Sequence, residues 1–226
     1  MTGPDDGTAG GAPSLTPGRI LDTAEEVLRR FGPQKTTVVD VARALGVSHG
    51  SVYRHFASKA ALRDAVTERW LARVAAPLGA WVVADGPALD RLRGWIGALA
   101  EAKRRKVLDD PELFATYQAL AIEARDVVGA HVDHLADDVR RILADGVARG
   151  EVAVGDPPAA ARAVLSSTAR FHHPAFAEEW SAPDIEAQLE DVWVIVAGGL
   201  RAPTATSRPQ REAPRPVRAP GSAGTR

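Results

Sequence analysis

Residues 37–62 of the chain read TVVDVARALGVSHGSVYRHFASKAAL. The first part of this stretch repeats apolar residues at helical spacing: Val38, Val41, Ala42 and Leu45. Thr37 stands at the position of an N-cap, with Asp40 three residues later as in a capping box. Gly46 follows the apolar run, and glycine commonly ends a helix in a left-handed conformation. These signals predict a short helix that ends in a tight turn.

A second short helix follows the turn. Ser48 is placed to cap it, and it carries the apolar and aromatic residues Val47, Val52, Tyr53 and Phe56 on or beside it. Ser58 is placed to cap a further helix that begins at Lys59. Two short helices joined by a tight glycine turn make a helix-turn-helix, whose second helix can enter the major groove of DNA.

A longer helix is expected before this motif. Thr16 is a suitable cap, and Pro17 fits the first helical position, where a missing N–H costs nothing. The apolar stripe of this helix contains Ile20, Ala24, Val27, Leu28 and Phe31. Gly32 and Pro33 should end it. Together these segments predict a three-helix head at residues 17–57.

The order of residues in the motif closely resembles the DNA-binding domain of the TetR family of bacterial repressors. The matching residues are Ala42, Leu45, Gly46, Val47 and Ser48, then Gly50, Val52, Tyr53, His55 and Phe56, then Ser58, Lys59 and Leu62. The resemblance implies a sequence-specific transcriptional regulator without enzymatic activity. It further implies a homodimeric repressor that a small-molecule ligand releases from a palindromic double-stranded DNA operator.

The predicted DNA-binding residues surround the second helix of the motif: Thr36, Thr37, Ser48, His49, Gly50, Ser51, Tyr53, Arg54, His55 and Lys59. His49 and Ser51 can exchange hydrogen bonds with bases, and Gly50 allows close approach of the backbone. Thr36 and Thr37 lie where a helix N-terminus can present hydroxyls and N–H groups to a phosphate. Tyr53, His55 and Lys59 match phosphate contacts of the resembling family, although a packed aromatic remains an alternative for Tyr53.

Composition restricts the remaining function classes. The chain has 226 residues and no cysteine, which excludes disulfides, thiolate nucleophiles and cysteine zinc sites. It has no apolar run of membrane-spanning length and no signal-peptide pattern, so we expect a cytoplasmic protein without a membrane partner. Residues 17–63 contain eight basic and four acidic side chains, whereas residues 71–200 contain 13 basic and 20 acidic ones. A basic head on an acidic body fits a protein that offers one end to phosphates.

Residues 58–200 read as helical patterns separated by proline, glycine and capping residues, which predicts an all-α fold with a six-helix body. The helix after Ser58 should run to about Pro77 and link head to body. Lys103–Lys106 is a basic run that suits a helix C-terminus, with a nucleic-acid patch as the alternative. The terminal segments 1–16 and 201–226 are expected to be disordered, the second being rich in Pro and Arg.

The resemblance also implies a ligand pocket among the body helices. The predicted lining residues are aromatic or polar: Trp95, Phe114, Tyr117, His131, Phe171 and His172. Packed core is the alternative for the aromatic members. No cofactor is expected, but His131, His134, His172 and His173 are weak candidates for a zinc or nickel site.

The last predicted helix, at about residues 183–200, is apolar all round between Trp193 and Ala197. A helix of this kind is buried on more than one side, and the resemblance implies that its second cover is another copy of the chain. The predicted dimer-interface residues are Val164, Leu165, Thr168, Ile185, Leu189, Val192, Trp193 and Val196. The alternative is a central helix of a monomeric bundle.

Two other functions remain open at this stage. A helical hydrolase using the body histidines with an aspartate is one, although no nucleophile elbow or metalloprotease motif supports it. A DNA-binding protein that is indifferent to sequence is the other.

Overall fold

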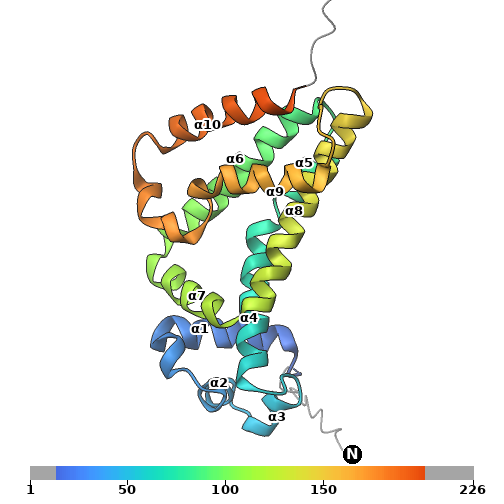
Figure 1. Ribbon diagram of the computed structural model, residues 1–226. Helices are drawn as coiled ribbons and strands as arrows, with labels where there is room; N and C mark the ends of the chain where they lie inside the picture. The colour runs from blue at the N-terminus through green and yellow to red at the C-terminus, as the bar shows by residue number, and fades with distance from the viewer. Residues whose placement is uncertain (1–13, 202–226) are drawn as a thin grey trace, which may run out of the picture.

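The structure is a computed structural model that describes residues 14–201. Figure 1 shows an all-helical molecule, with a small head below and a larger body above. Within residues 14–201 there is no β-strand, and one isolated bridge joins Val152 to Arg201. The predicted all-α class with an N-terminal helix-turn-helix is therefore confirmed. The predicted disordered segments 1–16 and 201–226 lie outside the described residues, apart from residues 14–16 and 201.

The head contains three helices in the predicted order: α1 (Pro17–Lys35), α2 (Val38–Leu45) and α3 (His49–Tyr53). Thr37 and Asp40 form the predicted capping box of α2, and Gly46 ends that helix with a φ of 70°. Ser48 caps α3 by accepting a hydrogen bond from the Ser51 N–H at 3.2 Å. Each of these bonds satisfies a backbone group that a helix end would otherwise leave unpaired.

The end of α1 differs from the prediction. Gly32 breaks the helix with a φ of 73°, as expected, but helical turns resume through Pro33 and end at Lys35. Phe31, predicted to lie on the buried stripe, is 49% exposed. The Arg30 guanidinium lies 5.2 Å from the centroid of its ring and covers part of it.

The body begins with α4 (Lys59–Ala75), which leaves the head and packs along α8 (Arg125–Ala148). The other long helices of the body are α6 (Ala88–Asp109), α7 (Pro111–Glu123), α9 (Pro157–Ser167) and α10 (Ile185–Leu200). Their boundaries follow the predicted breakers. Asp110 caps α7 in front of Pro111, Asp156 caps α9 in front of Pro157, and Gly150 follows α8 with a φ of 71°.

Three short elements of the body were not predicted: α5 (Gly79–Val83) and the 3-10 helices η1 (Ala169–Phe171) and η2 (Pro174–Ser181). They are short and, unlike α2 and α3, are not part of a recognisable sequence motif. Trp180 anchors η2, because its buried ring donates a hydrogen bond from Nε1 to the Arg170 carbonyl at 2.8 Å. One continuous core cluster extends from Ile20 in α1 to Leu200 in α10, so head and body are packed together.

Within residues 14–201, no helix is long and apolar enough to cross a membrane.

Candidate DNA-binding face and body cavities

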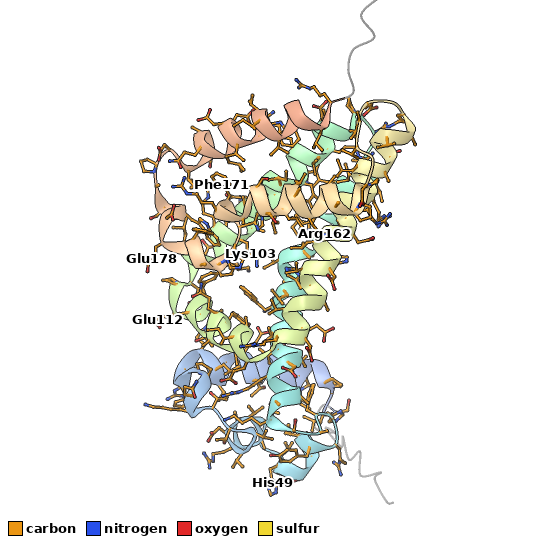
Figure 2. All side chains as sticks on the ribbon, viewed as in Figure 1. His49, Lys103, Glu112, Arg162, Phe171 and Glu178 are labelled. Atoms are coloured by element: carbon orange, nitrogen blue, oxygen red, sulfur yellow. The ribbon has the colours of Figure 1, made fainter. Side chains whose placement is uncertain are left out.

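Helix α3 presents one face to solvent and buries the other. Val52 is fully buried and holds α3 against the head core. His49, Gly50 and Arg54 are exposed, and Tyr53 is 42% exposed. Figure 2 shows His49 at the outer end of the head, far from the body. A five-residue helix is thus held by one apolar side chain while its polar groups remain accessible.

Several polar and aromatic side chains on and beside α3 contact one another. The Ser48 and Ser51 hydroxyl oxygens lie 2.9 Å apart, and Arg54 donates from Nη2 to Ser51 Oγ at 3.2 Å. The His49 and Tyr53 rings meet edge to face with centroids 6.4 Å apart. His55 is exposed just after α3, and Lys59 is half-buried at the start of α4.

Two predicted DNA contacts have roles inside the head. Thr36 is buried and donates from Oγ1 to the Gly32 carbonyl at 2.8 Å, so its assignment as a DNA contact is corrected to a core position. Thr37 is exposed, but its Oγ1 accepts from the Asp40 N–H at 3.2 Å and donates to Asp40 Oδ2 at 2.6 Å. Hydrogen bonds from Thr37 lower the pKa of Asp40. The Asp40 carboxylate is therefore ionised and occupies the α2 N-terminus, which is the place where a phosphate contact was expected.

Three of the predicted ligand residues belong to the packed core instead. Trp95 is fully buried and donates from Nε1 to Asp138 Oδ2 at 3.3 Å. Tyr117 stacks on Trp70 with ring centroids 4.7 Å apart. Phe114 meets Trp70 edge to face at 6.1 Å. Each of the three thus contacts core partners, and none lines either large cavity of the body.

The first of these cavities has a volume of about 750 Å³ and lies between α4, α5 and α8. We call it the α4–α8 cavity. Its walls include Leu71, Ala75, Val82, Val127, His131 and His134. Of the predicted ligand residues, His131 is the one that lines it. Four charged side chains also line it, Glu68, Asp126, Asp138 and Arg141, so its wall mixes apolar and charged groups.

The second cavity has a volume of about 540 Å³ and lies between α6, η2 and α10. We call it the α6–α10 cavity, and its walls include Ile96, Ala100, Phe171, Trp180, Leu189 and Trp193. Phe171 is the predicted ligand residue that it contains. Its rim is charged but neutralised, because Arg93 pairs with Glu190 at 2.7 Å and Arg104 with Glu186 at 2.6 Å.

The two inner histidines of the body are neutral at pH 7. Burial is the main cause that lowers the pKa of His131 to about 4, with smaller electrostatic contributions from Lys103 and His134. Burial, with Lys103 and His173, lowers the pKa of His172 to about 4 as well. His172 Nε2 lies 3.2 Å from Thr168 Oγ1, whereas buried His131 Nε2 has no hydrogen-bond partner among the described residues.

Lys103 is a functional candidate that the sequence interpretation missed. It was grouped with the basic run at the end of a helix, but its side chain is 5% exposed. Burial lowers its pKa to about 8, and its ammonium lies 5.1 Å from the centroid of the Trp70 ring. A signal was present, because Lys103 continues the buried stripe of Leu92, Ile96 and Leu99 at helical spacing. The neighbours Arg104 and Arg105 pair with Glu101, which partly neutralises the basic run.

The weak metal hypothesis gains no geometric support. Among residues 14–201, no group of three or more His, Asp or Glu side chains is arranged to hold a metal ion. His131 and His134 line the α4–α8 cavity, His172 contacts Thr168, and exposed His173 accepts the Ala175 N–H at 3.2 Å. The contacts of the four histidines therefore lie at different places in the body and do not form one shared site.

The residues predicted for a dimer interface are mostly buried within the single chain. Val164, Leu165, Thr168, Ile185 and Trp193 are core residues, while Leu189, Val192 and Val196 are half-buried. The predicted stripe of α10 therefore faces the chain's own body, which corrects the expectation for the first five. The exposed apolar residues of α10 are Val194, at 62%, and Ile195, at 76%.

Ion pairs connect the head with the body. Glu25 of α1 pairs with Arg69 at 2.7 Å and with Arg73 at 3.0 Å, both on α4. Arg73 also donates to the Tyr117 hydroxyl of α7 at 3.2 Å. Arg29 of α1 pairs with Asp110 at the start of α7, at 3.2 Å. Helices α4 and α7 are therefore both tied to α1.

Comparison with known proteins gives matches to both parts. The family model described as "Bacterial regulatory proteins, tetR family" matches residues 20–66. The model described as "Tetracyclin repressor-like, C-terminal domain" matches residues 88–193. The HTH-type transcriptional repressor KstR2 of Mycobacterium tuberculosis is 34% identical over 85 residues, which are 38% of this chain and 42% of that repressor. The chain thus matches less than half of the length of this curated relative.

Solved structures share the fold over most of the chain. SmeT, the repressor of the Stenotrophomonas maltophilia multidrug efflux pump SmeDEF, has 19% identity and a TM-score of 0.61, covering 91% of this chain and 98% of its own. The regulator FadR of Bacillus subtilis, in complex with stearoyl-CoA, has 16% identity and a TM-score of 0.58, covering 81% of this chain and 99% of its own. At these identities the likeness shows the fold alone. With one regulatory family model on the head and another on the body, the chain belongs to the TetR family of bacterial regulators.

Proposed function

We propose that the protein is a homodimeric transcriptional repressor that binds a palindromic DNA operator and leaves it when a small molecule binds the body. The α3 face carries this proposal, because Val52 fixes the helix while His49, Gly50 and Tyr53 stay accessible. Few of these side chains can make bidentate base contacts, so the shape of the DNA should contribute to recognition. The hydrolase alternative is set aside, since both matching family models describe regulatory proteins.

The test is binding to DNA from the control region of the chain's own gene. A repressor should retain a labelled duplex from that region against a large excess of random DNA, because specific sites bind about 10³-fold or more tighter than random ones. Equal competition by random DNA would instead indicate a sequence-indifferent binder. Measurements at two salt concentrations separate the phosphate contribution from base and shape recognition.

The exposed apolar face of α10 supports a dimer of the chain. Val194 and Ile195 are both largely exposed there, and a second copy would bury them. A dimer places two α3 helices for successive major grooves only if they lie about 34–36 Å apart. Ile195→Glu should give a folded monomer by light scattering and lose operator binding. Val132→Glu, on an exposed apolar residue of α8, is the matched control and should remain dimeric.

The link from ligand to operator should pass through α4 and α7. Both helices contact α1, through Glu25 and through Arg29. A ligand that binds better when these helices are displaced would shift the population toward a head spacing unsuited to the operator. Operator titration with and without ligand measures this coupling as a ratio of dissociation constants.

A further inference from the structure

The α6–α10 cavity lies behind the helix that carries the proposed dimer face. Figure 1 shows α10 lying across the top of the body, above α6. Leu189 and Trp193 of α10 line the cavity, whereas Val194 and Ile195 of the same helix are exposed. A molecule in this cavity would therefore contact α10 from inside the chain and would leave the exposed residues free for a second copy.

Gly97 of α6 keeps part of this cavity open. A Cβ added at Gly97 would meet no atom of another element within 4 Å, whereas a Cβ added at Gly94, one turn earlier, would clash with the Trp81 ring. Close packing thus explains Gly94 but not Gly97. A glycine inside a helix destabilises the fold relative to alanine, because it loses more conformational freedom on folding. Its effect at position 97 is to leave space beside Ala100, which lines the same cavity.

The walls of the cavity are aromatic and aliphatic. They are formed by Ile96, Phe171, Trp180, Ile185, Leu189 and Trp193. The Trp180 indole N–H already donates to the Arg170 carbonyl at 2.8 Å, so this ring offers the cavity apolar surface and no free donor. The cavity volume of about 540 Å³ falls within the range of roughly 300–1,000 Å³ that is usual for small-molecule sites.

Every charged side chain that lines the cavity is already paired. The pairs are Arg93–Glu190, Arg104–Glu186, Arg104–Glu101 and Arg105–Glu101, with N···O distances of 2.5 to 2.7 Å. The three arginines and the three glutamates of the lining therefore balance one another. An ionic ligand would lose water of hydration here and find no free countercharge, which is unfavourable.

We propose that the α6–α10 cavity binds one uncharged, largely apolar molecule that contains an aromatic ring system. This inference rests on the proposed function, in which the body binds a small molecule, and it assigns the site and the chemical class. Tryptophan and phenylalanine rings favour stacked or edge-to-face contacts with a flat ligand. The balanced charges of the rim favour an uncharged molecule, and the space beside Gly97 receives part of its ring system.

The experiment titrates the full chain with the uncharged probe N-phenyl-1-naphthylamine. The comparison probe is 8-anilinonaphthalene-1-sulfonate, which has the same ring skeleton and one negative charge. The uncharged probe should bind at one site per chain and quench tryptophan emission, because Trp180 and Trp193 line the cavity. The sulfonate should bind about tenfold more weakly or worse, since the lining has no free cation. Equal or tighter binding of the sulfonate would overturn the proposal.

Gly97→Leu places a side chain in the cavity and should weaken binding of the uncharged probe about tenfold or more. Its melting temperature should equal or exceed that of the wild type, because leucine is the better helix former. Gly129→Leu is the matched control, because Gly129 is an exposed glycine of α8 that also has open surroundings and lines neither cavity. It should bind the probe like the wild type.

Ala100→Leu fills the same cavity from the next turn of α6, and it takes the place of Gly97→Leu if that variant does not fold. An unchanged affinity in these folded variants would place the probe elsewhere and overturn the proposal.

A second copy of the chain is the other candidate for covering this cavity. In that case the monomeric variant Ile195→Glu would bind the uncharged probe and the dimeric wild type would not, which would also overturn the proposal. A gel shift of the ligand-free wild type on its operator is run in parallel. Loss of that shift would count against the repressor function, whereas the probe titrations test the cavity alone.

Discussion

The exposed α3 face of the head and the interior of the body differ in how their polar side chains are paired. On α3, Ser48, Ser51 and Arg54 form hydrogen bonds with one another at the surface. In the body, the buried Lys103 ammonium lies over the Trp70 ring, and the buried His131 Nε2 has no hydrogen-bond partner among residues 14–201. The polar groups around Ser51 are thus paired with one another, whereas the His131 nitrogen in the body has no such partner among the described residues. Substitutions in the two regions should differ accordingly in whether they change stability or binding.

The largest effect is expected from placing a charge where the head is well packed. Val52→Asp buries an unpaired carboxylate under α3 and should destabilise the head by about 3–5 kcal/mol. Denaturant unfolding followed by circular dichroism measures the loss. Val39→Asp is the control, because Val39 lies exposed on α2 and should change stability little. An unaltered midpoint for Val52→Asp would contradict the assigned anchoring of α3.

The next effect is a loss of stability at mildly acidic pH that originates in the body. The pKa values of His131 and His172 are lowered from 6.5 to about 4 in the folded chain. Between these pH values the unfolded chain binds more protons than the folded chain. The stability that these neutral histidines contribute is therefore fully present above pH 6.5 and is lost as the pH falls to 4. For the more deeply buried His172 the decline is about 3 kcal/mol, with less from His131.

Urea unfolding of the ligand-free protein at pH 7 and pH 5 measures this decline. His172→Gln should reduce it, while His55→Gln, at an exposed histidine of the head, should leave it unchanged. A pH dependence that is the same in all three proteins would show that the body histidines are not held in the neutral form by burial.

Local signals in the sequence determine most of the head, and this explains why its prediction is accurate. Thr16, Thr37, Ser48 and Ser58 each cap the helix that follows, and Gly46 takes the left-handed conformation that ends α2. Cap bonds join residues two or three positions apart, so the sequence order contains them. Thr36 is the exception, because its burial depends on how α1 and α2 meet.

The candidate site in the body depends on contacts between distant segments, which the sequence does not order. Lys103 belongs to an apolar stripe, but its burial beside Trp70 requires α4 and α6 to come together. Trp95 and Tyr117 were predicted to line a pocket and instead fill the core, since both meet partners more than 40 residues away. The apolar stripe of α10 was predicted correctly as a stripe, but the sequence does not say which of its faces meets the body and which meets solvent.

A smaller effect concerns phosphate contacts of the head. Tyr53→Phe combined with Lys59→Ala removes two groups that we propose to contact the DNA backbone. Operator affinity should fall roughly tenfold, and the salt dependence of binding should weaken by about one unit of slope. The melting temperature should stay within a degree or two, because neither group holds the head together. An unchanged gel shift at moderate salt would remove both residues from the interface.

The smallest effect compares the two tyrosines of the chain, one in each region. In the body, the Tyr117 hydroxyl accepts a hydrogen bond from Arg73, and burial raises its pKa to about 12. Tyr117→Phe keeps the ring on Trp70 and removes this one bond, so it should lower the free energy of unfolding by about 1 kcal/mol. Ligand-free operator affinity should stay the same, because Glu25 still holds Arg73. Tyr53→Phe alone should do the reverse and weaken operator binding without changing stability. If both substitutions changed the same property, the distinction between an accessible head surface and a packed body interior would be wrong.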